Sequence, residues 1–151
     1  MKPYPERLLR ILADKTEGLR PFPVPGWVHN GHWIARSSIR ADGRPVEHLN
    51  AESAARFLDN HFGAAQEPLE LVGYCQRPKW ADGTGIGIFC RLYEGPEGVI
   101  AVDDDYAALL DGLTPVHLLT EERERSSVGG IDTDGVLWCW IMPVTLEPIA
   151  Y

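Results

Sequence analysis

The amino-acid sequence predicts an α+β fold, in which two or three short helices pack on a mostly antiparallel β-sheet. A length of 151 residues suits a single domain with one sizeable core. Short apolar runs are separated by turn signals such as Asn-Gly and Asp-Gly, and few stretches have helical spacing. We therefore expect residues 1–151 to form one domain, in which 1–26 make an N-terminal helix and a proline-rich connector and 27–151 make the core.

The composition is acidic and limits the classes of partner. Lys and Arg total 14 against 22 for Asp and Glu, giving a formal net charge of -8 and a pI near 5.0, which disfavours nucleic acid and anionic lipid as partners. The sequence has no run of about 18 apolar residues and no export signal, so we expect a cytoplasmic protein. Cys75, Cys90 and Cys139 lie in apolar or strand-like runs and are expected to be buried and unpaired.

The N-terminal segment predicts a short amphipathic helix followed by an extended connector. Pro5 suits the first position of a helix, and the apolar stripe ends at Leu12. The stretch 21–26, PFPVPG, has three prolines that deny the backbone ladder donors. A rigid connector is favoured over a proline-rich ligand for another protein.

The stretch 27–34, WVHNGHWI, is the clearest local signal, because Asn-Gly between apolar runs predicts a two-residue hairpin turn. That register places His29 opposite His32 and puts Trp27 and Ile34 on the same face as both histidines. Two histidines can contribute to a zinc site, but a structural zinc normally needs four ligands, so His29 and His32 are only weak metal candidates. We favour a cross-strand pair at an exposed hairpin tip, with no metal and no cofactor.

A second helix is predicted after Asn50, which suits an N-cap position, with apolar residues from Ala54 to Phe62 on one face. His61 lies on that stripe and is interpreted as a histidine at the edge of the core, since nothing nearby in sequence orients it as a catalytic base. Strands are then expected over 69–75 and 85–93. The glycines between them lack a dinucleotide-binding fingerprint, and Trp80 is a candidate to pack against them.

Three consecutive carboxylates, at 103–105, follow a short strand predicted over 99–102. They could bind Mg²⁺ or Ca²⁺, but an apolar helical run follows at once, so N-capping and the helix dipole explain them better. A strand is expected over 116–119. The polar stretch 121–130 is then expected to be a loop and a place of contact with a partner.

The last apolar stretch, 135–146, reads GVLWCWIMPVTL and predicts a central strand. Alternation puts Leu137, Cys139 and Ile141 on one face and Trp138 and Trp140 on the other, so both faces are apolar. One face is expected to pack on helices. The other then needs a second layer, from the 27–34 hairpin or from a second subunit, so this strand is the expected dimer interface.

The C-terminal third resembles the last domain of the bacterial DNA polymerase sliding clamp. In that family a helix that opens on a similar Asp-Tyr-Leu-Leu pattern precedes a strand, and the chain ends in a hydrophobic strand. The resemblance implies two packed helices under antiparallel sheets and a face on which short peptides of partner proteins dock. It does not extend to DNA encirclement, because the predicted helices lack the basic faces that line a clamp. The matching residues are Asp103, Tyr106, Leu109, Leu110, Met142, Pro143 and Leu146.

Three function classes remain open from sequence. We favour a non-catalytic interaction or accessory protein of a bacterium, phage or plasmid, because no catalytic motif is present. A small-ligand-binding protein would use a surface of tryptophans and histidines, with Trp27, His29, His32, Trp33 and Trp80 as the candidates. An enzyme would need one of the histidines in a pocket beside carboxylates such as Asp103 to Asp105.

Overall fold

The computed structural model describes residues 2–13, 18–62, 65–77, 87–119 and 127–144. Its helices are α1 (Glu6–Leu12), α2 (Ala51–Phe62) and the 3-10 helix η1 (Tyr106–Leu110). The first five strands are β1 (Arg20–Pro21), β2 (Trp27–His29), β3 (Trp33–Arg36), β4 (Ala65–Pro68) and β5 (Glu70–Arg77). The others are β6 (Ile88–Gly95), β7 (Gly98–Asp103), β8 (Thr114–Leu119), β9 (Ser127–Ile131) and β10 (Leu137–Ile141).

The strands form two sheets whose pairings are all antiparallel. The larger sheet has the order β1-β2-β3-β10-β9-β8-β4, and the smaller has the order β5-β6-β7. With the helices packed on them, these sheets confirm the predicted α+β class and a single domain. No helix in the described ranges is long and apolar enough to cross a membrane.

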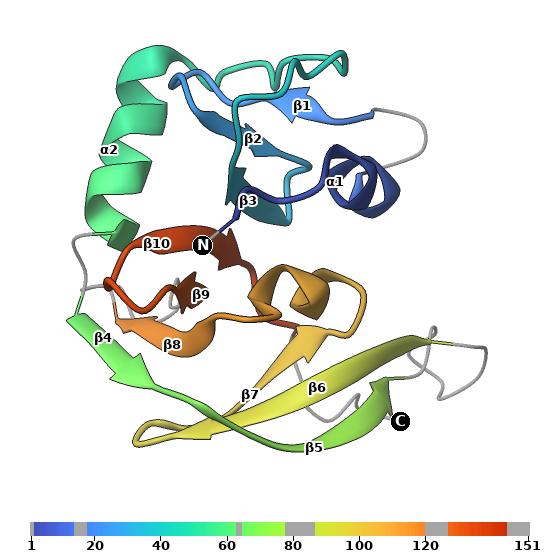
Figure 1. The fold of residues 1–151 in the computed structure, drawn as a ribbon, viewed down its shortest axis with the longest axis vertical. Helices are drawn as coiled ribbons and strands as arrows, with labels where there is room; N and C mark the ends of the chain where they lie inside the picture. The colour runs from blue at the N-terminus through green and yellow to red at the C-terminus, as the bar shows by residue number, and fades with distance from the viewer. Residues whose placement is uncertain (1, 14–17, 63–64, 78–86, 120–126, 145–151) are drawn as a thin grey trace.

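The seven-stranded sheet separates two hydrophobic cores (Figure 1). On one face, α2 contributes Ala54 and Leu58, which pack with Leu118 and Trp140. We call this the α2-side core. On the other face lie α1, η1 and part of the three-stranded sheet, and η1 contacts β7, β9 and β10. We call this the α1-side core. Both faces of the central strands are therefore covered within one chain.

Side-chain hydrogen bonds explain where α2 starts. The Asn50 carboxamide accepts a hydrogen bond from the Ser53 N–H at 2.8 Å, and the Ser53 hydroxyl accepts one from the Asn50 N–H at 3.1 Å. This reciprocal pair confirms Asn50 as the predicted N-cap.

In α1, Leu9 and Leu12 are buried as predicted, whereas Ile11 is 66% exposed. The side chain of His61 lies outside the described residues.

The N-terminal segment is part of the core rather than a connector to it. Tyr4, Leu9 and Leu12 belong to the α1-side core, and the Tyr4 hydroxyl donates a 2.7 Å hydrogen bond to the Leu109 carbonyl. Residues 20–21 pair with β2 as an edge strand. Phe22 is buried in the α2-side core. The start of the proline-rich stretch is therefore held in place by strand pairing with β2 and by burial of the Phe22 side chain.

The hairpin forms, but in a different register from the predicted one. His29 pairs with Ile34, Val28 with Ala35 and Trp27 with Arg36, and the Asn30 N–H donates to the Trp33 carbonyl at 3.3 Å, so the turn is centred on Gly31 and His32, one residue later than predicted. The Asn30 side chain explains the difference, because its oxygen accepts the N–H groups of His32 and Trp33, at 2.8 and 3.0 Å. The side chain therefore accepts the Trp33 N–H, which the Asn30 carbonyl would accept in a regular two-residue turn.

The last strand is central, as predicted, but its alternation is broken. The pairing of β10 with β9 is irregular between Leu137 and Cys139, as at a β-bulge. Cys139 and Ile141 face the α1-side core, and Trp140 faces the α2-side core as predicted. The break moves Leu137 to the α2 side and Trp138 to the α1 side, opposite to the predicted alternation.

The expected use of this strand as a dimer interface is wrong for residues 137–141. The 27–34 hairpin does not cover β10, since β3 is its neighbour in the same sheet. The second layer is instead made by α1, η1 and the small sheet of the same chain. Trp140 is 7% exposed, and Cys139 and Ile141 are fully buried. No apolar face of this strand remains for a second subunit.

Two other expectations differ from the structure. The helix predicted after the carboxylates is only the short η1. Part of the polar stretch 121–130 is not a loop, because β9 lies between β8 and β10 and its residues 127–130 are buried. Residues 120–126 lie outside the described ranges.

The glycines of β9 are required by close packing, and this can be tested. A Cβ added at Gly130 would lie 2.8 Å from Leu113 Cδ1 and 3.1 Å from both Cys139 Sγ and Leu110 Cδ2. Because the contacts come from three side chains, we expect Gly130→Ala to destabilise the fold by about 1–3 kcal/mol in urea unfolding. Gly73→Ala is the control, since its nearest atom would be 4.0 Å away. Equal stability of the two variants would contradict this account.

Candidate functional site

The candidate ligand-binding residues do not form one exposed surface. Trp27, His29 and Trp33 are all buried, and Trp33 has no exposed surface. His32 is exposed on the loop between β2 and β3. Trp80 lies outside the described residues. Only His32 of the described candidates is therefore accessible to a ligand.

His29 and His32 point to different neighbours. The His29 ring contacts Phe22 edge-on, with centroids 5.5 Å apart, and its Nδ1 accepts the Gly31 N–H at 3.1 Å. The His32 ring stacks on Tyr106 of η1, with centroids 6.1 Å apart and planes 17° apart. Within the described ranges, no group of three or more His, Cys, Asp or Glu side chains could hold a metal ion.

Burial also determines the protonation of His29. Loss of hydration lowers the pKa of His29, and the nearby positive charge of Arg20 lowers it further. The backbone of Pro21 acts in the opposite direction. Burial likewise lowers the pKa of His117 on β8, against the opposing effect of Glu67 and Glu97. Both histidines are therefore held neutral in the folded protein near pH 7.

The ring of Trp27 contacts the side chain of Arg36 in the same sheet. The guanidinium of Arg36 lies 4.4 Å from the centroid of the Trp27 ring and 5.8 Å from that of Trp138. The same guanidinium donates two hydrogen bonds to the Leu137 carbonyl, at 2.9 and 3.1 Å. Trp138 in turn donates to the Asp132 carboxylate at 2.8 Å. These aromatic groups fix the turn and strand positions around β10.

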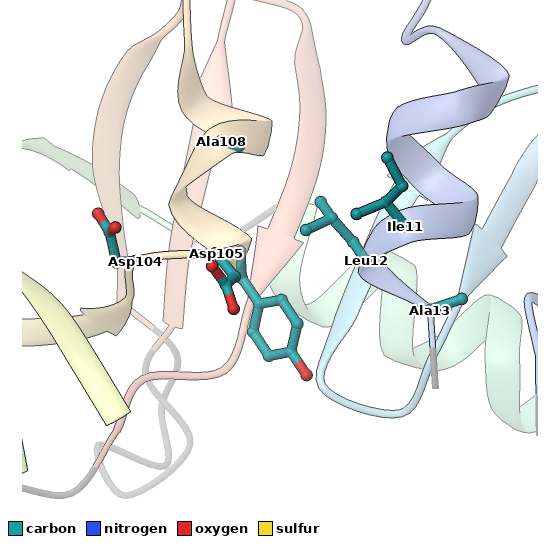
Figure 2. A pocket seen from close by; sticks show the side chains of 7 residues that line it. Ile11, Leu12, Ala13, Asp104, Asp105 and Ala108 are labelled. Atoms are coloured by element: carbon teal, nitrogen blue, oxygen red, sulfur yellow. The ribbon is translucent and has the colours of Figure 1, made fainter. Parts of the chain in front are cut away.

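A pocket of about 460 Å³ lies between the end of α1 and the start of η1. In Figure 2, Ile11 and Leu12 project from α1 toward η1, and Asp104 lies on the side of its segment away from α1. The wall is therefore apolar on the α1 side and acidic at the base of η1. The lining residues are Ile11, Leu12, Ala13, Asp104, Asp105, Tyr106 and Ala108.

Asp103 and Asp104, at the start of the turn before η1, are bonded to other parts of the fold. Asp104 accepts a 2.7 Å charged hydrogen bond from the Nε of Arg91, whose other arm lies 3.5 Å from Asp111. Asp103 accepts the Asp105 N–H at 2.9 Å. Burial raises the pKa of Asp103, and the Asp105 and Asp104 charges add to this. The three acidic residues thus close the turn between β7 and η1, consistent with a local structural role.

An exposed apolar surface on β5 and β6 was not found by sequence reasoning. Tyr74 is 68% exposed and Phe89 is 59% exposed, on neighbouring strands. We name the surface formed by Leu71, Tyr74 and Phe89, which share one face of the sheet, the β5–β6 patch. Val72, at the register shift, and Ile88, on the opposite face, are exposed as well. The sequence predicts both strands, and the alternation of their apolar and polar residues is typical of a half-buried sheet. The sequence does not indicate which part of these two strands would lack a covering layer. The position of that part depends on where α1 and η1 end.

No family model, curated protein or solved structure matches this chain. Of the residues that resemble the sliding clamp, Asp103 ends β7, and Tyr106, Leu109 and Leu110 belong to η1. Met142 is exposed beyond β10, and Leu146 lies outside the described ranges. The functional interpretation therefore depends on the geometry of the chain itself.

Asn30 joins the hairpin to α1, and its removal should destabilise the fold. Its Nδ2 donates to the Leu12 carbonyl at 3.1 Å, in addition to the two N–H groups that its oxygen accepts. We expect Asn30→Ala to lower the free energy of unfolding by about 2–3 kcal/mol, because buried donors and an acceptor lose their partner. Urea denaturation measures this. Asn60→Ala, at an exposed position of α2, is the control and should change stability by less than about 0.5 kcal/mol.

The two neutral histidines predict a loss of stability in mild acid. The unfolded chain binds protons on these side chains near pH 6.5, whereas the folded chain, with lowered pKa values, does not. Their contribution is therefore complete above about pH 6.5 and is lost as the pH falls toward 5. Urea unfolding of wild type and of the His29→Gln/His117→Gln variant at pH 7 and pH 5 checks this. The variant should lose less stability than wild type between pH 7 and pH 5, and an equal loss would refute the assignment.

Proposed function

We propose that this chain is a non-catalytic interaction protein that binds another protein through the β5–β6 patch. The observation that carries the proposal is that Leu71, Tyr74 and Phe89, all of them exposed, share one face of two neighbouring strands. Contiguous exposed apolar surface of this kind marks sites of protein contact, because leaving it in water is unfavourable. Aromatic residues such as Tyr74 and Phe89 are also the types enriched at protein interfaces.

The other function classes have less support from geometry. A small-ligand surface of tryptophans would need accessible rings, but Trp27 and Trp33 are buried. Of the two carboxylates that line the pocket beside η1, that of Asp104 already pairs with Arg91. An enzyme that uses His29 with a carboxylate would need that ring to reach solvent, whereas burial and Phe22 enclose it.

The cellular setting is part of the same proposal. Cys75, Cys90 and Cys139 do not form disulfides, which suits the reducing cytoplasm. The acidic composition supports a protein partner over nucleic acid or membrane. We propose an accessory role in a bacterium, phage or plasmid. A sliding-clamp relationship remains a proposal with the same consequence, since it implies docking of short peptide segments.

Photo-cross-linking in the native host tests the proposed interaction. A photoreactive phenylalanine analogue placed at position 74 should yield discrete cross-linked protein products, because Tyr74 lies in the patch. The same analogue at position 11 is the matched control, since Ile11 is 66% exposed but lies on α1, outside the patch. Mass spectrometry of the products identifies the attached chain.

A second variant separates docking from chance contact. Phe89→Lys, combined with the analogue at position 74, should abolish the products by placing a charge within the patch. Identical products from positions 74 and 11, or products unaffected by Phe89→Lys, would refute the proposal. Unchanged urea unfolding of each variant confirms that the fold is retained.

A further inference from the structure

We propose that Cys75 and Cys90 form a reversible dithiol–disulfide site that reacts with low-molecular-weight disulfides such as glutathione disulfide. Cys75 lies on β5 and Cys90 on β6, two strands that run side by side (Figure 1). In their antiparallel register the two cysteines are direct partners. The third cysteine, Cys139, instead pairs with Ala35 and Gly130 in the larger sheet and takes no part.

Backbone hydrogen bonds define the geometry of the cysteine pair. The Asp104 N–H donates to the Phe89 carbonyl at 2.8 Å, so the backbone groups of Phe89 point toward β7. Those of the next residue, Cys90, therefore point toward β5, and Cys75 and Cys90 are a hydrogen-bonded pair. The Cα atoms of such a pair lie about 5.5 Å apart, within the range of about 4.4–6.8 Å that a disulfide spans. The strand register thus places the two residues for a bond between their sulfurs.

The same geometry makes such a bond strained and therefore easy to reduce. Directly opposite Cβ atoms lie about 4.5–5.5 Å apart, with hydrogen-bonded pairs at the wide end, whereas a disulfide prefers about 3.8 Å. Closing the bond requires the two strands to approach one another locally, against the backbone hydrogen bonds that set their spacing. Strained disulfides are the labile or regulatory ones, because their reduction potentials are less negative than those of structural disulfides. The pair therefore suits reversible oxidation rather than a permanent cross-link.

The different exposure of the two sulfurs assigns their order of reaction. Cys75 is half-buried, whereas Cys90 is fully buried and its thiol donates a weak hydrogen bond to the Ile88 carbonyl at 3.8 Å. The Cys75 thiolate attacks one sulfur of glutathione disulfide, which forms a mixed disulfide and releases one glutathione thiolate. The Cys90 thiolate then attacks the Cys75 sulfur and releases the second glutathione thiolate. The two protein thiols are oxidised, one glutathione disulfide is reduced, and the two thiol protons pass through water to the released thiolates.

The cysteine pair lies on the opposite face of the small sheet from the β5–β6 patch. Tyr74 and Phe89 precede Cys75 and Cys90 by one residue each, and successive residues of a strand point to opposite faces. The proposal therefore does not depend on the proposed protein interaction, and either can fail without the other.

Oxidation of the purified full chain by glutathione disulfide, at about pH 8 to favour thiolates, tests the site. After acid quenching and titration of thiols in urea, wild type should have lost two of its three thiols. Peptide mass mapping should then show a link between positions 75 and 90 within one chain, and dithiothreitol should restore all thiols. Cys139→Ala removes the cysteine outside the pair, so it is the matched control and should form the same disulfide.

Single variants test the assigned order of reaction. Cys90→Ala leaves the accessible Cys75 without its resolving partner, so its mixed disulfide with glutathione should be at least about tenfold more abundant than in wild type. Cys75→Ala should form little glutathione adduct, because the remaining Cys90 is buried. Urea unfolding of the reduced variants checks that they fold, and Cys90→Ser replaces Cys90→Ala if the smaller side chain destabilises the sheet.

Three results would overturn the proposal. In the first, wild type keeps all its thiols under native conditions, or stops at the mixed disulfide as Cys90→Ala does. In the second, the disulfide forms only in urea, which would mean that the folded strands do not bring the sulfurs together. In the third, the bond joins two chains or includes Cys139.

Discussion

Burial of β10 on both faces is the constraint on which the rest of the structure depends. Cys139 and Ile141 are fully buried on one side of the sheet, and Trp140 is buried against Phe57 and Leu58 on the other. A strand without a solvent face needs a covering layer on each side. One layer is α2. The other must be assembled from α1, η1 and the small sheet, so the N-terminus has to fold back onto η1.

Features controlled by neighbouring residues could be predicted from the sequence. The cap at Asn50 and the turn at Asp132 are both made by a side chain that bonds backbone N–H groups a few residues away. Such bonds need no information from the rest of the chain. The α+β class followed from the same kind of signal, because short apolar runs between turns can only be strands of an antiparallel sheet.

Features controlled by distant packing could not be predicted. β9 contains Gly129 and Gly130, which have low strand propensity, yet it is central because Leu118, Leu137 and Cys139 leave no room for side chains there. The hairpin register depends on Asn30 bonding to Leu12, 18 residues earlier. The burial of the candidate residues could not be predicted for the same reason, since a tryptophan such as Trp33 suits a surface or a core equally well and only the layer packed over it decides which.

The small sheet shows that alternation alone does not decide burial. Tyr93 and Phe89 are an even number of residues apart on β6 and share one face, yet Tyr93 is 3% exposed and Phe89 is 59% exposed. Tyr93 packs with Leu69 and Val102 in the α1-side core, whereas Phe89 lies outside that core. The apolar pattern of β6 therefore continues beyond the layer that the described residues supply. Apolar side chains that share one face of neighbouring strands, without cover from the described residues, separate the β5–β6 patch from isolated exposed residues such as Ile11, and this contiguity is what supports the proposed interaction.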